Sequence, residues 1–494
     1  MLPAVVGRTE VDGVPVFWVD DPGPFTAGLV LGMGVLDETF RTAGVGHAVE
    51  HLALSVLGRT HLDFTGQHRL TETEFTATGP VEEVLAFLEQ VCRGLTSLPM
   101  DRLCLECGVM AAEASRATGP ADAVLLALRY GYDSLGLAPL DVVPPSSIGE
   151  ADVLEHVERL VTTGNAAVYL SAPPPPGLRV PLPRGPRPER AAPLVRGPAG
   201  PGWVPVDSPL PGLGVVGKDT VALRVAGRVL ADRCRETLRR NEALVYDLAY
   251  KVVAPGDGTV HLSFGPECRR EQSGRVAGRL WEIACELADR GPGDDDLAHD
   301  LAGLRAALAD PRSVAGEAYL AASEHVAGRE RPARSEVLAQ AEALTPEDVR
   351  LAFAEALAGG YLVVPDGTRP SVPLAQVPGC AASRAVPEDA DVLKRRRFRS
   401  AAPPGTALFL LPDGVGLRDE DGDVHVVRWD DCVGVGVDGE VRVVTGRDRC
   451  WVLVDPADWR DGWRAVRHVD AGVDPGLRYA LQHDDPLPQL RLMG

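Results

Sequence analysis

Two histidines and a glutamate in the segment GVGHAVEHLAL carry the clearest chemical pattern in the sequence. His47, Glu50 and His51 stand at positions i, i+3 and i+4, so a helix places their side chains near one face. Two imidazoles one turn apart can bind one zinc ion, and a carboxylate beside them can take a proton from water. The spacing therefore predicts a hydrolytic zinc site.

A tetrahedral zinc site of this kind needs a third protein ligand and one open position. The helical segment RLCLECGVMAAEAS offers two acids seven residues apart, Glu106 and Glu113. Seven residues are about two helical turns, so both acids lie on the same face. We expect Glu113 to be the third ligand, and Glu106 to orient a ligand or a water molecule from behind.

The histidine–glutamate pattern leaves one alternative open, because exposed helices often carry these residues without a metal. The glycine-rich approach to the helix and the apolar LALSVLG that follows favour the zinc interpretation. Cys104 and Cys107 have Cys-x-x-Cys spacing but no second pair, so we interpret them as buried helical thiols. His61 and His68 could line a cleft, but we interpret them as solvent-facing loop residues.

Composition bounds the kind of protein that positions these residues. The chain has 494 residues, 45% hydrophobic and 24% charged, which is typical of globular proteins and long enough for about three domains. Its net charge of −20 excludes nucleic acid as an expected partner. Nine scattered cysteines form no disulfide framework. With no signal-peptide pattern and no apolar run long enough to span a bilayer, we expect a cytoplasmic protein.

Two proline-rich stretches divide the chain into segments of different texture. In both large segments, strand-like and helical stretches alternate before an apolar strand closes the segment, AAVYLSA in the first and GGYLVVP in the second. This repeat predicts an α+β fold with an internal duplication. The expected parts are a zinc-binding first half (1–172), a proline-rich linker (173–204), a second half (205–365), a second linker (366–399), a small C-terminal domain (400–482) and a tail (483–494).

Residues 400–482 contain short alternating strands separated by PDG, EDGD and VDG turns, followed by a helical stretch. A small antiparallel β domain capped by a helix resembles a pleckstrin-homology-like domain. We interpret the basic run 394–399 as a solvated linker rather than a membrane contact. The stretch 297–309 has apolar residues at helical spacing, and we expect it in the core.

The segment GMGVLDETFRTAGVGHAVEHLAL resembles the start of the insulinase-like (pitrilysin-type, M16) zinc metallopeptidases, whose inverzincin motif is His-x-x-Glu-His. The acids of RLCLECGVMAAEAS match the downstream acidic pair of that family. The resemblance implies that His47, His51 and Glu113 bind zinc, that Glu50 is the general base and that Glu106 supports the site.

The segment LRRNEALVYDLAY resembles the Arg-x6-Tyr motif of the same family, with Arg239 and Tyr246 at that spacing. In the family these residues reach from the second half to the substrate carbonyl and support the oxyanion. Three departures stand out. The gap from His51 to Glu113 is short, the family's Asn-Ala-x-Thr stretch appears only as LDFTGQH, and Ala243 replaces the glycine of the Arg-x6-Tyr motif.

The resemblance implies a zinc endopeptidase that hydrolyses peptides or small unfolded segments in a chamber between two halves. The substrate would add as a strand at a sheet edge near TETEFTATG. The resemblance also implies a homodimer, or a heterodimer with a related subunit. A catalytically degenerate binding or scaffolding subunit is the alternative, and the short gap before Glu113 favours it. The intact histidine–glutamate triple favours the enzyme, whether for general peptide turnover or for trimming one leader peptide.

Overall fold

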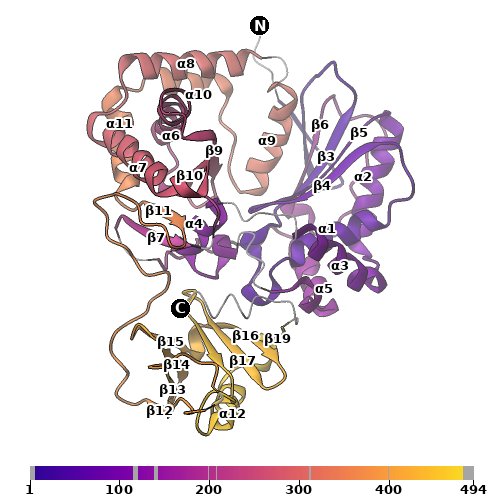
Figure 1. The fold of residues 1–494 in the computed structure, drawn as a ribbon. Helices are drawn as coiled ribbons and strands as arrows, with labels where there is room; N and C mark the ends of the chain where they lie inside the picture. The colour runs from indigo at the N-terminus through magenta and orange to yellow at the C-terminus, as the bar shows by residue number, and fades with distance from the viewer. Residues whose placement is uncertain are drawn as a thin grey trace.

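The computed structural model describes residues 6–114, 121–137, 143–197, 200–206, 208–310, 313–398 and 400–481. Within them the chain forms two large sheets covered by helices and two smaller four-stranded sheets (Figure 1). The expected tail at 483–494 lies outside the described residues. In the described part, no helix is both long and apolar enough to cross a membrane.

Six strands form the first sheet in the order β1-β2-β6-β3-β5-β4. Their bounds are β1 (Gly7–Val11), β2 (Val14–Trp18), β3 (Thr26–Leu31), β4 (Asp63–His68), β5 (Thr73–Thr78) and β6 (Ala166–Leu170). The segment TETEFTATG forms β5, which is paired with β3 on one side and with β4 on the other. The sheet edge expected near this segment is its direct neighbour, β4.

The second sheet repeats five strands of the first, in the order β7-β11-β8-β10-β9. Its strands are β7 (Gly202–Val206), β8 (Gly212–Lys218), β9 (Val245–Val253), β10 (Thr259–Cys268) and β11 (Tyr361–Pro365). The first two strands in this order pair parallel to each other, and every later neighbouring pair is antiparallel. The strands β2-β6-β3-β5-β4 of the first sheet pair in the same way. The two halves thus share one topology, as the predicted duplication requires.

The helices follow the strands in the same order in both halves. The first half contains α1 (Val45–Ser55), α2 (Val81–Thr96), α3 (Leu103–Ala114), α4 (Ala121–Tyr130) and α5 (Glu150–Leu160). The second contains α6 (Val221–Cys234), a π-helical turn (Arg235–Asn241), α7 (Ser273–Arg290), α8 (Asp294–Ala309), α9 (Ala315–Val326), α10 (Arg334–Glu342) and α11 (Pro346–Leu357).

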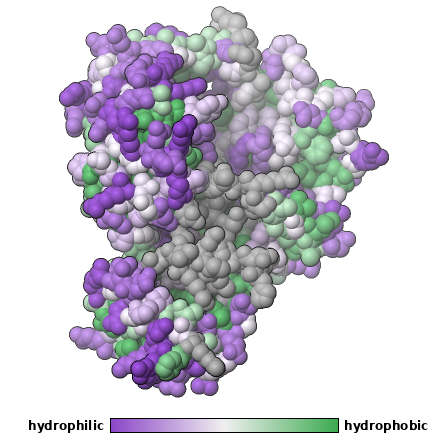
Figure 2. Space-filling model, in the orientation of Figure 1, coloured by the Kyte–Doolittle hydropathy of each residue, from purple (hydrophilic) through white to green (hydrophobic). Residues whose placement is uncertain are grey.

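The stretch 297–309 is helical as expected, but it is not in the core. It belongs to α8, whose one buried residue is Asp300, bound to Arg228 through contacts of 2.7 and 2.9 Å. Its four leucines share one face that is only half-buried, with Leu297 packing at the margin of the second-half core, whereas its alanines are exposed. Figure 2 shows hydrophilic residues over much of the visible surface of the second half. It also shows a recess between the two halves.

Each large sheet is also covered by a helix from the other half, as Figure 1 shows for α4 beside β7 and β11 and for α9 beside β3 and β6. Helix α4 packs Val124, Leu125 and Leu128 against the second sheet. Helix α9 packs Ala318, Ala321, Ala322 and Val326 against the first. The exchange buries apolar surface between the halves, which couples their folding.

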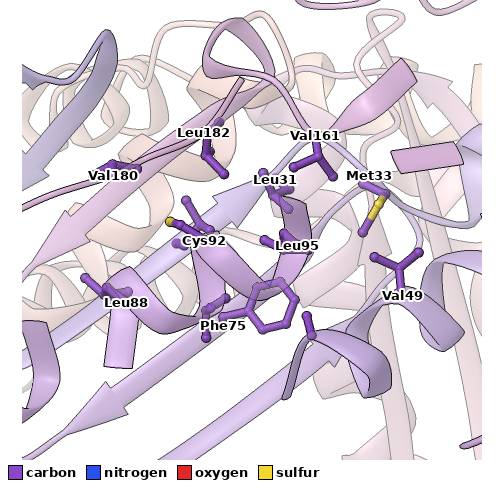
Figure 3. Close-up of a cluster of buried hydrophobic side chains, with 14 of the residues drawn as sticks. Leu31, Met33, Val49, Phe75, Leu88, Cys92, Leu95, Val161, Val180 and Leu182 are labelled. Carbon is purple, nitrogen blue, oxygen red and sulfur yellow. The ribbon is translucent and has the colours of Figure 1, made fainter. Parts of the chain in front are cut away.

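The proline-rich linker is extended, as expected of proline at that density, but it is docked on the first half. Val180 and Leu182 are buried in the first-half core, where Figure 3 shows them with Leu31, Leu88 and Cys92. The linker is therefore part of the packed structure rather than a free spacer.

Two four-stranded sheets and one helix make up the C-terminal part. One sheet contains β12 (Asp391–Lys394), β13 (Ala407–Leu411), β14 (Gly414–Arg418) and β15 (Val424–Arg428) in that order. The other, in the order β18-β17-β16-β19, contains β16 (Cys432–Asp438), β17 (Val441–Gly446), β18 (Trp451–Val454) and β19 (Arg478–Ala480), and α12 (Gly462–Gly472) packs beside them. All neighbouring pairs in these two sheets are antiparallel except β16 with β19, which is parallel. Strand β12 lies within the stretch that was expected to be the second linker.

A buried histidine at the junction of the halves makes the stability depend on pH. His261 of β10 lies 2.6 Å from the Tyr130 hydroxyl at the end of α4. Burial, aided by Arg129, lowers the pKa of His261 to about 3, whereas an unfolded histidine titrates near 6.5. Between these values the unfolded chain binds the extra proton, so stability falls as the pH falls.

Between about pH 7.5 and pH 5.5, we expect the free energy of unfolding to fall by about 1 kcal/mol more in wild type than in His261→Asn. Urea unfolding of both proteins at the two pH values measures this difference. An identical loss in wild type and variant would show that His261 is not the group responsible.

Candidate functional site

A buried acid fixes the start of α1, the helix that carries the histidine–glutamate motif. Gly44 precedes α1 at φ 86°, a backbone conformation that favours glycine. The amides of Gly44 and Gly46 donate to the Glu38 carboxylate at 2.8 and 2.9 Å. Burial opposes ionisation of Glu38, yet His68 and these amides hold its pKa below the usual value. A negative charge at this helix end matches the helix dipole and holds α1 in place.

The interpretation of His68 as solvent-facing was wrong, whereas that of His61 holds. The His68 side chain is buried, with Nδ1 at 2.8 Å from the Thr73 hydroxyl and Nε2 at 3.2 Å from Glu38. Its ring lies parallel to that of His47, with centroids 6.4 Å apart. His61 is exposed and lies 3.3 Å from Glu83.

The three predicted zinc ligands converge. Nε2 atoms of His47 and His51 are 3.1 Å apart, and they lie 3.5 and 3.6 Å from Oε2 of Glu113. A tetrahedral zinc ion with ligands at about 2.0–2.1 Å holds its donor atoms about 3.4 Å apart. The spacing and the donor types both fit such an ion. Helix α3 packs directly against α1, so the short gap after His51 still delivers Glu113 to the motif.

The charges around the cluster suit metal binding. Burial, followed by the nearby His51 and His68, lowers the pKa of His47 to about 4. The His47 imidazole is therefore neutral near pH 7, with a lone pair available for a cation.

Glu50 occupies the position expected of a proton carrier. Its Oε2 lies 3.7 Å from Nε2 of His47, and its side chain is buried. Burial raises the pKa of Glu50, with a smaller contribution from Glu113. A raised pKa makes a carboxylate a stronger proton acceptor than an ordinary one.

Glu106 lies next to Nδ1 of His51, the ring nitrogen that faces away from the cluster. Its Oε2 is 3.5 Å from Nδ1 of His51, and Arg102 donates to its other oxygen at 2.7 Å. A carboxylate in this position sets the tautomer and orientation of a metal-binding imidazole. Glu106 therefore stands where a supporting residue is needed.

The edge strand β4 passes directly beside Glu50. A Cβ atom added at Gly66 would lie 2.1 Å from Oε1 of Glu50 and 2.8 Å from Cδ1 of Leu54. The segment LDFTGQH, which departs from the family pattern, therefore supplies the strand whose missing side chain makes room for the glutamate.

For a hydrolytic site built on this cluster, we expect Gly66→Ala to lower kcat by about 10-fold or more, because misplacing a reacting group by about 1 Å costs up to about 100-fold. The added methyl meets the far end of flexible side chains, so the zinc content and the melting temperature should change little. Gly58→Ala is the control, because nothing lies within 4 Å of its Cβ. Equal loss of activity in Gly66→Ala and Gly58→Ala would contradict the placement of Glu50 as the proton carrier.

Arg239 and Tyr246 lie next to each other and away from the cluster. The Arg239 guanidinium is 5.8 Å from the centre of the Tyr246 ring, and both side chains are exposed. They flank the start of β9, the edge strand of the second sheet. Ala243, which replaces the family's glycine, has φ 50°, in the left-handed region where glycine is favoured.

Of the two helical thiols, Cys107 is buried, whereas Cys104 is exposed. Burial raises the pKa of Cys107, which suits an unreactive core thiol. The interpretation as buried thiols therefore holds for Cys107 and was wrong for Cys104.

No protein-family model matches the sequence, and no curated protein does. Solved structures do match the fold. An inactive domain of an M16 peptidase from Pseudomonas fluorescens is 16% identical, with a TM-score of 0.60, covering 76% of this chain and 100% of its own. A protease from Helicobacter pylori is 15% identical, with a TM-score of 0.61, covering 73% and 99%. The periplasmic protease PqqL from Escherichia coli is 13% identical, with a TM-score of 0.57, covering 89% and 57%.

These likenesses define the class of fold. The chain has the mixed α/β fold of M16 peptidases, with two topologically equivalent halves and an additional pair of small sheets at the C-terminal end.

Proposed function

We propose that this protein is a zinc-dependent endopeptidase of the M16 type that hydrolyses peptides or small unfolded segments. The observation that carries the proposal is the triangle formed by His47, His51 and Glu113, at 3.1 to 3.6 Å, with Glu50 buried beside it. The fold that carries these residues supports the proposal, because it is similar to the fold of a solved protease.

In this proposal His47, His51 and Glu113 hold Zn²⁺, which when bound supplies a Lewis acid for the scissile carbonyl and for water. Glu50 accepts a proton from the attacking water and returns it to the leaving amine. Glu106 keeps the His51 ring oriented, since it contacts the opposite ring nitrogen.

We assign Arg239 and Tyr246 to the developing oxyanion, because the family motif implies this role and charged or hydroxyl donors suit it. Both side chains are exposed on the second half and lie away from the cluster, so the assignment rests on the family motif.

The proposed substrate adds as a strand to β4. Backbone groups on the free side of an edge strand can pair with an extended peptide of almost any sequence. A peptide seated there would pass close to Glu50, which β4 contacts at Gly66. Selection would then depend on whether a segment can unfold enough to extend.

The proposal includes a cytoplasmic location and a paired assembly, either a homodimer or a heterodimer with a related M16 subunit. The nine free thiols support a reducing compartment. This chain matches 57% of the PqqL protease, and a structure of the first half of that protease matches it as well. Light scattering of the purified protein measures the assembly directly, and a monomeric mass would contradict it.

Metal removal tests the proposed activity. We expect the purified protein to cleave a mixed pool of unstructured peptides, to lose cleavage after treatment with a chelator, and to regain it with added zinc. Mass spectrometry of the products identifies the cleaved bonds. Cleavage that persists after zinc is removed would contradict the proposal.

A binding or scaffolding role is the second candidate, favoured by the similarity to an M16 domain that is described as inactive. It predicts no cleavage of any peptide in the same assay. It also gives no reason for the spacing of the three ligand atoms, so the enzyme remains the better supported function.

A further inference from the structure

Two cysteines and a histidine meet in the C-terminal part of the chain. The Sγ atoms of Cys380 and Cys450 are 3.3 Å apart, and Nδ1 of His425 lies 3.4 and 3.5 Å from them. Thiolate and imidazole groups are the preferred ligands of zinc, and three of them leave a fourth position for solvent. Tetrahedral zinc holds such donors about 3.6 Å apart, so the cluster needs only a small expansion to accept the ion.

A carboxylate holds the other nitrogen of the His425 ring. Nε2 of His425 lies 3.2 Å from Oδ2 of Asp419, whose Oδ1 accepts a hydrogen bond from the Asp423 amide at 2.7 Å. The carboxylate favours a proton on Nε2, which leaves Nδ1, beside the two sulfur atoms, as the nitrogen that would bind a metal. This arrangement of carboxylate, histidine and donor cluster is the one that orients imidazoles in zinc sites.

Asp448 connects the two turns that carry the cysteines. Its carboxylate accepts hydrogen bonds from the amide of Cys450 at 3.0 Å and from the amide of Ala381 at 3.2 Å. The two sulfur atoms are therefore held near each other by contacts that do not depend on a metal. A site that is assembled in advance binds an ion with less loss of entropy.

The cluster lies where the chain passes from the second half to the C-terminal sheets. Before Cys380, the amide of Val377 donates to the Trp203 carbonyl of β7 at 3.0 Å. After it, Ser383 and Val424 exchange two backbone hydrogen bonds of 3.0 and 2.6 Å. His425 belongs to one C-terminal sheet, and Cys450 directly precedes a strand of the other.

We propose that Cys380, His425 and Cys450 bind a zinc ion that fastens this connecting stretch to the corner where the two C-terminal sheets meet. The ion joins three segments that are far apart in the sequence, and solvent fills its fourth position. The proposal is independent of the peptidase activity, because it shares no residue with the His47 cluster. A disulfide between the two cysteines is the competing outcome for the same atoms.

Cobalt(II) distinguishes this site from the His47 cluster, because thiolate ligands give cobalt an intense near-ultraviolet charge-transfer band and histidine or carboxylate ligands do not. We expect this band when the reduced, metal-free, full-length protein is titrated with cobalt chloride. It should keep its full intensity in His51→Ala. It should lose half its intensity or more in Cys380→Ser and Cys450→Ser, with binding weakened by more than about 100-fold.

Cys432→Ser is the matched control, because Cys432 is a buried thiol of the same sheets whose sulfur contacts the Gly434 carbonyl instead. Cys380 is half-buried on the connecting stretch, so its replacement leaves the sheets intact. Absence of the band in wild type, or a band unchanged in Cys380→Ser, would overturn the proposal. An intact mass lower by two hydrogens in protein purified without reductant, with no zinc bound, would assign the pair to a disulfide instead.

Discussion

Replacement of Glu50 by glutamine is expected to reduce kcat for peptide hydrolysis by about 1,000-fold while zinc stays bound. Glutamine keeps the size and polarity of the side chain, but it cannot accept a proton from water, and general acid–base catalysis contributes about 10²–10⁴ in rate. Burial raises the pKa of Glu50, so a neutral side chain is tolerated there and the fold should remain stable. Initial rates on one identified cleavage product, with zinc content measured in parallel, check both statements.

Glu83→Gln is the matched control for this variant. Glu83 is an exposed acid at the start of α2 and contacts His61 rather than the cluster. Its replacement should leave kcat within about twofold of wild type. If Glu50→Gln and Glu83→Gln were equally active, Glu50 would have no part in the chemistry.

Removal of one imidazole is expected to remove the metal. His51→Ala takes away a ligand that lies 3.1 Å from its partner nitrogen on His47 and is supported by Glu106. Loss of a residue that merely orients a ligand weakens metal binding by about 10- to 100-fold, so loss of the ligand itself should cost more. We expect neither measurable zinc at this site nor measurable cleavage in this variant.

His61→Ala is the control for that experiment, because His61 is an exposed histidine on the same half of the chain. Zinc content should fall by one ion per chain in His51→Ala and stay unchanged in His61→Ala. Unchanged zinc in both variants would place the metal elsewhere, and the peptidase proposal would lose its basis.

The local parts of the site could be predicted from the sequence, because helical spacing alone determines them. His47, Glu50 and His51 share one turn of α1, and the two acids of α3 share one face. Their convergence depends on the packing of α1 against α3, which the sequence indicated only through the family resemblance.

The contacts that depend on strand pairing could not be predicted. His68 contacts Glu38 because β4 packs next to α1. The sequence indicated an extended stretch at β5, but it does not say which neighbouring strand has a free edge. The room that Gly66 makes for Glu50 has the same origin.

Long-range exchange between the halves was also outside the reach of the sequence. Helices α4 and α9 each bury an apolar face on the sheet of the other half, and no local pattern distinguishes that sheet from their own. The cluster of Cys380, His425 and Cys450 was missed for a related reason. Its members are separated by 45 and 25 positions, with none of the close pairs that mark zinc motifs.

Anomalous diffraction at the zinc absorption edge, from crystals of the wild-type protein, tests the central claim most directly. The account predicts an anomalous peak within about 2.0–2.2 Å of Nε2 of His47, Nε2 of His51 and a carboxylate oxygen of Glu113. A map from zinc-supplemented crystals that shows no peak between these three side chains would contradict it.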